Sequence, residues 1–128
     1  MSLHPINLIL RFQLEIAALV AVGYWGFATH TGLGRVLFGI LLPAAIAVAW
    51  AVLAVPGDRA RSGLAPLPVP GALRLLLELA FFAFAAWALY DAGHPLLATI
   101  LAGVTLVHYG LSYDRVAWLI RHTRTTGA

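Results

Sequence analysis

Two arginine–glutamate pairs carry the side chains of this sequence that are best suited to chemistry. In the segment LRFQLEIAA, Arg11 precedes Glu15 by four residues. In the segment LRLLLELAF, Arg74 precedes Glu78 by the same spacing. Residues four apart lie on one face of a helix, so each pair can interact. Because ionisable residues within a membrane are costly and mark ion pathways or internal ion pairs, these four are candidate functional residues.

The two segments lie 63 residues apart, which is close to half of the 128-residue chain. This spacing predicts a tandem duplication of a helical hairpin, with halves at about 6–55 and 72–113 that are related by an axis along the membrane normal. Two schemes of ion pairing are open. In one, each glutamate pairs with the arginine of its own helix. In the other, each pairs with the arginine of the opposite segment, which would fix the packing of the two halves.

His108 is a third polar element, expected at a depth similar to that of the glutamates. Imidazole titrates near neutral pH, which suits proton relay beside membrane carboxylates. We therefore predict one buried cluster, which is either a proton or cation pathway or a charge-compensated network that holds the helices together. Equal numbers of Arg and Glu favour compensation. The predicted cluster consists of Arg11, Glu15, Arg74, Glu78 and His108.

Composition sets the class of protein to which these residues belong. Hydrophobic residues make up 62% of the chain, charged residues make up 10%, and the mean hydropathy is +0.91. A soluble domain has about 45–50% apolar and about 25% charged residues. A hydrocarbon core of about 30 Å is crossed by about 20 helical residues. The sequence therefore predicts an all-α, multi-pass integral membrane protein with no soluble domain.

Four apolar runs are expected to form a four-helix bundle of two tandem, parallel-related hairpins within a single transmembrane domain, residues 1–128. Pro43 lies near the middle of the second run and should kink that helix, because proline removes a backbone hydrogen bond. The predicted spans are about 6–28, 36–55, 72–90 and 95–113.

The arginines predict the orientation. Cytoplasmic loops of membrane proteins carry an excess of Lys and Arg, and only Arg35 opposes an arrangement in which both termini are cytoplasmic. The segment 114–128 mixes apolar and basic residues and is expected to continue helically into the membrane interface. Its predicted lipid anchors are Arg115, Trp118, Arg121 and Arg124.

No cofactor, metal or nucleic acid is expected. The chain has no cysteine, which excludes thiolate zinc sites and iron–sulfur clusters. His30 and His94 occupy outer turns and could bind a metal together, but they lack carboxylate or thiolate support, so we expect solvated loop histidines. A haem on His108 would need a second axial ligand that the sequence does not offer. There is no Gly-rich phosphate loop and no nucleophile triad, so we expect no enzymatic activity.

Three stretches carry a family resemblance: LRFQLEIAALVAVGYWGF, LRLLLELAFFAFAAWALYDAGHP and HYGLSYDRVAWLIR. They resemble the YrdB-like family of small four-helix bacterial membrane proteins, a domain of unknown function. The resemblance implies a multi-pass protein of the bacterial cytoplasmic (inner) membrane and transfers no catalytic residue. Small multidrug exporters also have four short spans and a glutamate in the first, but they lack a second Arg–Glu segment.

Two functions are consistent with these features. The first is a non-enzymatic accessory or structural subunit that packs on itself as a homo-oligomer or on a larger membrane complex, within the lipid bilayer. The alternative is a small proton- or cation-linked transporter or channel that uses Glu15, Glu78 and His108. Binding of lipid headgroups or of a partner by the arginines is a third hypothesis.

Overall fold

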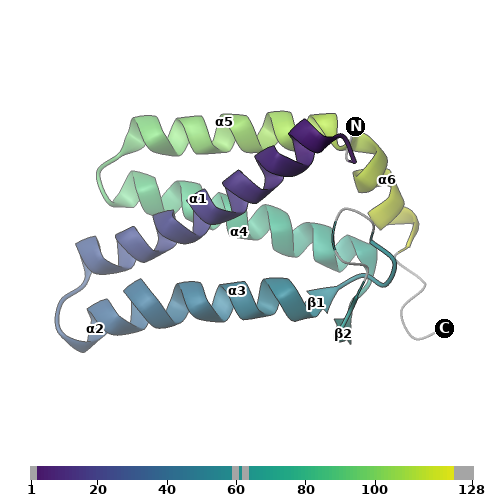
Figure 1. Ribbon diagram of the computed structural model, residues 1–128. Coiled ribbons are helices and arrows are strands. Elements are labelled where there is room, and N and C mark those ends of the chain that lie inside the picture. The colour runs from purple at the N-terminus through teal and green to yellow at the C-terminus, as the bar shows by residue number, and fades with distance from the viewer. Residues whose placement is uncertain (1–2, 59–60, 62–63, 123–128) are drawn as a thin grey trace.

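The computed structural model describes residues 3–58, 61 and 64–122, and its helices lie side by side in Figure 1. The helices are α1 (Pro5–Thr29), α2 (Leu33–Val36), η1 (Leu37–Leu41), α3 (Leu42–Val52), α4 (Gly71–Asp91), α5 (Pro95–Leu111) and α6 (Tyr113–Arg121). Two short strands, β1 (Leu53–Ala54) and β2 (Leu67–Pro68), pair in parallel. In Figure 1, the start of α1, helix α6 and the two short strands all lie toward the right-hand end of the bundle.

Within the described residues, three helical segments are long and apolar enough to cross a membrane. They are Pro5–Thr29, Leu33–Val52 and Gly71–Asp91. A fourth crossing is reached if α5 and α6, which are bent by 71° relative to one another, form one broken span. The protein is therefore all-α with membrane-compatible helices, whereas the number of spans, the tandem repeat and the orientation remain predictions.

The second expected span, 36–55, differs most from the structure. The helix begins at Leu33, before Arg35, directly after Gly32, whose positive φ of 58° ends the preceding turn. It ends at Val52, because Leu53 and Ala54 leave the helix and pair with β2. The expected disturbance at Pro43 takes the form of a π-helical turn, η1, which ends two residues before the proline and accommodates the missing backbone donor.

The tail also differs from a straight continuation of the last span. Helix α5 ends at Leu111, and α6 turns back across the start of α4. The Gly71 N–H donates to the His122 carbonyl at 3.4 Å. A side chain at Gly71 would collide with the Leu119 carbonyl, so only glycine permits this contact. Leu119 packs in a small cluster with Val55 and Val69.

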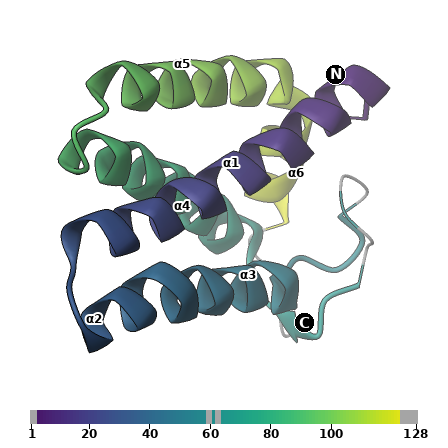
Figure 2. The same cartoon turned by 60° about the vertical axis from the view of Figure 1, so that its left-hand side comes forward.

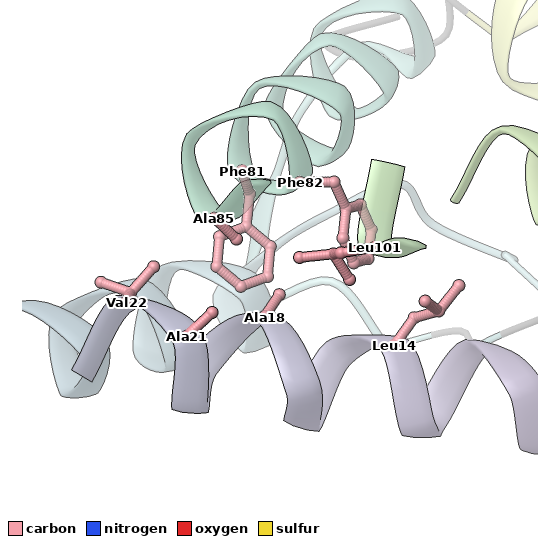
Figure 3. Packing of buried hydrophobic residues seen from close by; sticks show 8 residues of the cluster. All are labelled: Leu14, Ala18, Ala21, Val22, Phe81, Phe82, Ala85 and Leu101. Carbon is pink, nitrogen blue, oxygen red and sulfur yellow. The ribbon is translucent and has the colours of Figure 1, made fainter. Parts of the chain in front are cut away.

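The main core lies where α1 crosses the bundle diagonally (Figure 2). The side chains in this core are apolar, and Figure 3 shows those of α1 meeting those of α4 and α5. These side chains carry no polar atom, and they fill the middle of the bundle. The cluster consists of Leu14, Ala18, Ala21, Val22, Phe81, Phe82, Ala85 and Leu101.

The segment α2–η1–α3 packs on one side only. Gly39 is its single buried residue, whereas about a third of the corresponding apolar stretches of α1 and α4 is buried. At Gly26 of α1 the two segments approach so closely that a side chain there would collide with the backbone of Phe38 in η1. The remaining face of α3, which includes Val48, is exposed and apolar.

Candidate functional site

A buried polar network occupies the end of the bundle where α1 and α4 begin. At its centre, the side chain of Glu78 is 0% exposed. Its Oε1 accepts hydrogen bonds from the Tyr109 hydroxyl at 2.6 Å and from Arg115 Nη1 at 2.8 Å. Its Oε2 accepts from Arg74 Nε at 2.7 Å, Arg115 Nη2 at 2.8 Å and Arg11 Nη2 at 3.2 Å. One carboxylate thus holds three guanidinium groups and a phenol.

Arg115 links this carboxylate to a second one in the loop after α3. Its Nε lies 3.2 Å from both carboxylate oxygens of Asp58, and its Nη2 lies 2.6 Å from Asp58 Oδ2. Both side chains are buried. The prediction that Arg115 is a lipid anchor is therefore corrected: the bend after α5 directs it into the bundle, where two carboxylates offset the cost of burying its charge.

Arg74 ties the network to the end of α3. Its Nη1 donates to the carbonyl of Trp50 at 2.8 Å and to that of Leu53 at 2.6 Å. Carbonyls at the end of a helix lack partners within the helix. A positive charge there also interacts favourably with the negative end of the helix dipole. The guanidinium lies 4.4 Å from the centre of the Trp50 indole ring, a cation–π distance.

Arg61 approaches the same place from the loop. Its Nη2 donates to the Trp50 carbonyl at 2.8 Å. Burial and the neighbouring charge of Arg74 lower the pKa of Arg61 to about 10, so the group remains protonated at neutral pH. Three carboxylates, those of Glu15, Glu78 and Asp58, balance the charges of the three central arginines. Arg61 therefore adds a positive charge that these carboxylates do not balance.

Glu15 lies at the edge of the network. Its side chain is 21% exposed and pairs with Arg11 Nε at 3.0 Å. Both own-helix pairs are present, but only one crossed pair, Arg11 with Glu78, occurs. No ion pair joins Glu15 to Arg74 within the part of the chain that the structure describes. The pairing combines the two schemes that the sequence left open.

His108 is buried beside the network but bonds to other groups. Its Nδ1 lies 2.9 Å from the Asn7 side-chain oxygen, and Asn7 Nδ2 donates to Ser112 Oγ at 2.8 Å. The imidazole ring lies 5.2 Å from the ring of Tyr109. His108 therefore joins the start of α1 to the end of α5, and among the described residues no hydrogen bond links it to either glutamate.

Besides Arg61, sequence reasoning missed four members of this polar end. Asn7 lies four residues before Arg11, and Ser112 lies four residues after His108, so helical spacing could have found both. Tyr109 is adjacent to His108. Asp58 lies in a loop, where no periodic signal exists.

The opposite end holds His30 and His94 in separate contacts. His94 Nε2 lies 3.0 Å from the Tyr24 hydroxyl, and His30 stacks on Phe38 at a ring distance of 4.3 Å. The indole N–H of Trp25 donates to Asp91 at 2.8 Å. Within residues 3–58, 61 and 64–122, no group of three or more His, Asp or Glu side chains could hold a metal ion.

The other predicted lipid anchors are on α6 or beyond it. Trp118 is half-buried and stacks on His122 at 4.0 Å between ring centres. Arg121 is exposed. Arg124 lies outside the described residues.

Comparison with known proteins gives a family but no activity. The family model described as "Protein of unknown function (DUF2568)" matches residues 9–106. "Uncharacterized protein YrdB" of Bacillus subtilis (strain 168) is 37% identical over 119 residues, which cover 93% of this chain and 97% of that protein. No solved structure matches.

Proposed function

Because the chain belongs to the DUF2568 family of proteins of unknown function, as its resemblance to the YrdB-like family predicted, we propose its role from the geometry of the polar end. The protein is a non-enzymatic, multi-pass membrane subunit that packs on itself or on a larger membrane complex. The Arg–Glu–Asp network is its internal structural element.

The observation that carries this proposal is the saturation of Glu78. Five donor contacts from four side chains hold its two oxygens. A carboxylate that exchanges protons or cations needs access to water, and this one has none. A buried, fully paired charge instead fixes which helices meet and in which register.

The apolar middle of the bundle supports the same role. The core shown in Figure 3 lies between the polar end and the outer turns. Ions and protons cross a membrane along polar side chains or water, and the eight side chains of this core carry no polar group. A passage through the centre of a single subunit would therefore require the helices to separate.

The exposed face of α3 is the best candidate for the surface that meets another subunit. Helices of membrane bundles usually gain stability from packing against neighbours. Unlike α1 and α4, the segment α2–η1–α3 has packed neighbours on one side only. An additional helix on its free face would give it the packing of the other segments.

The arginines support a location in the bacterial inner membrane, with both termini in the cytoplasm. Five of the described arginines lie at the polar end and Arg35 lies at the opposite end; the five are Arg11, Arg61, Arg74, Arg115 and Arg121. This distribution is what the positive-inside rule favours.

Site-specific crosslinking in native membranes tests the proposal. The chain contains no cysteine, so a single introduced thiol reports one position. We expect Val48→Cys on α3 to crosslink to a second copy or to another membrane protein. Leu106→Cys on α5, which is equally apolar and also exposed, is the control and should not. Equal, weak crosslinking at both positions would contradict the proposal.

Glu15 favours a second candidate function. Its partly exposed carboxylate is joined through Arg11 to Glu78, which gives the network one contact with the exterior. A proton- or cation-linked transporter would use this contact. In proteoliposomes it predicts a proton flux that Glu15→Gln abolishes without loss of fold, and a flux that survives the substitution would exclude this candidate.

A further inference from the structure

A cleft of about 280 Å³ lies between α3 and α4, beside the polar network. Trp50 and Arg74 line it at the end where α3 finishes and α4 starts. Away from that end its walls are apolar, with Ile46 and Ala49 from α3 and Leu77 and Ala80 from α4. The cleft is thus amphipathic along its length.

In the part of the chain that the structure describes, two hydrogen-bond donors at this cleft have no acceptor. Arg74 Nη2 and Trp50 Nε1 are both buried without a hydrogen-bond partner. The Arg74 side chain is only 1% exposed, and its other two nitrogens are used by Glu78 and by the end of α3. Buried donors are almost always paired in proteins. Two unpaired donors on neighbouring residues of one cleft therefore indicate an acceptor that the described residues do not supply.

The charge of this region identifies the kind of acceptor. Within the described residues, the three central arginines are matched by three carboxylates, and Arg61 contributes one further positive charge next to Trp50. An acceptor that carries a negative charge complements this excess, and a guanidinium donates well to phosphate oxygens.

The depth of the cleft identifies the kind of molecule. Trp50 lies two residues before the end of α3, and Arg74 lies three residues after the start of α4. Both are at the level where the apolar spans end, which is the level of lipid headgroups. The apolar walls continue one to two helical turns deeper, where an acyl chain would lie.

We propose that the cleft between α3 and α4 binds one anionic phospholipid. Its phosphate oxygens accept hydrogen bonds from Arg74 Nη2 and Trp50 Nε1, and an acyl chain lies along Ile46, Ala49, Leu77 and Ala80. The proposal needs the membrane setting of the proposed function but not the role as a subunit. The lipid binds within one protein chain, so crosslinking at Val48 and lipid binding succeed or fail separately.

Native mass spectrometry of the purified full chain with defined lipids tests this site. We expect one phosphatidylglycerol molecule to be retained about tenfold better than phosphatidylcholine with the same acyl chains, because a charged hydrogen bond is at stake. Inorganic phosphate in excess should not displace the lipid, since it makes no contact with the apolar walls.

Three variants locate the lipid. Trp50→Phe removes one donor and keeps an aromatic ring, and Ala80→Leu fills the apolar part of the cleft. Each should lower retention of phosphatidylglycerol about tenfold. Ala83→Leu, one turn along α4 at an exposed position outside the cleft, should change it less than twofold. Equal retention of the two lipids, or equal retention by all variants, would overturn the proposal, and circular dichroism establishes that each variant is folded.

Discussion

The two Arg–x–x–x–Glu segments have the same local geometry and opposite surroundings. In α1, Arg11 Nε lies 3.0 Å from Glu15, and in α4, Arg74 Nε lies 2.7 Å from Glu78. Glu15 is partly exposed and has one arginine partner. Glu78 is fully buried and has three. The difference comes from position in the bundle: α4 is covered by α1, α5 and α6, whereas Glu15 lies at an outer edge of α1.

This contrast shows that the contribution of an ion pair to stability depends on how deeply the pair is buried. The Arg11–Glu15 pair contributes less, because water can replace its partly exposed carboxylate. A buried carboxylate among three guanidinium groups cannot lose its charge without leaving several buried cations unpaired. The same motif is therefore an accessory contact in α1 and the centre of the structure in α4.

Glu78→Gln should produce the largest effect. The amide keeps the shape of the side chain but removes the charge that Arg11, Arg74 and Arg115 share. We expect a loss of about 3–5 kcal/mol in the free energy of unfolding, measured by denaturant titration in detergent micelles. A variant as stable as the wild type would mean that the network does not hold the bundle together.

Arg115→Lys should follow in size. The guanidinium reaches Glu78 and Asp58 at once, whereas an ammonium is a compact charge that cannot bridge two carboxylates in this geometry. We expect a loss of about 2–3 kcal/mol in unfolding free energy. Arg121→Lys on the exposed face of α6 is the control and should be neutral. Equal effects of the two would contradict the burial of Arg115.

Gly71→Ala breaks the contact that brings α6 onto α4. The added methyl group would collide with the Leu119 carbonyl, so α6 must move and Arg115 with it. We expect a destabilisation of about 1–3 kcal/mol and faster amide hydrogen exchange in residues 113–121. Gly103→Ala, which lies inside α5 and meets open space, should neither destabilise the protein nor speed exchange in residues 113–121. Similar exchange in the two variants would show that α6 does not depend on this contact.

Glu15→Gln should have the smallest effect. It removes a single i,i+4 pair whose carboxylate is partly exposed, and we expect a change of less than about 1 kcal/mol in unfolding free energy. Thermal unfolding in micelles, side by side with Glu78→Gln, measures the contrast directly. If Glu15→Gln were as damaging as Glu78→Gln, the two segments would be equivalent and the asymmetry described above would be wrong.

The helices themselves were largely predictable. The expected spans 6–28 and 72–90 each fall within one residue of the ends of α1 and α4, because long apolar runs with clear limits form them. The second and fourth spans were less well placed. Residues 53–55 continue the apolar pattern, but pairing with β2 takes part of them out of the helix. The break at Ser112 has no proline or glycine immediately beside it to mark it.

The sequence by itself determined the class of this protein and the two local Arg–Glu pairs. Composition sets the solvent in which the chain can fold, and helical spacing sets which neighbours share a face, and both are local properties. Only the tertiary structure decided that Glu78 rather than Glu15 is the buried centre. Its partners Arg115 and Tyr109 come from 37 and 31 residues away, and Asp58 reaches Arg115 from a loop 57 residues distant. Such long-range contacts depend on how α5 and α6 turn back over α4. No pattern within a single segment encodes that arrangement.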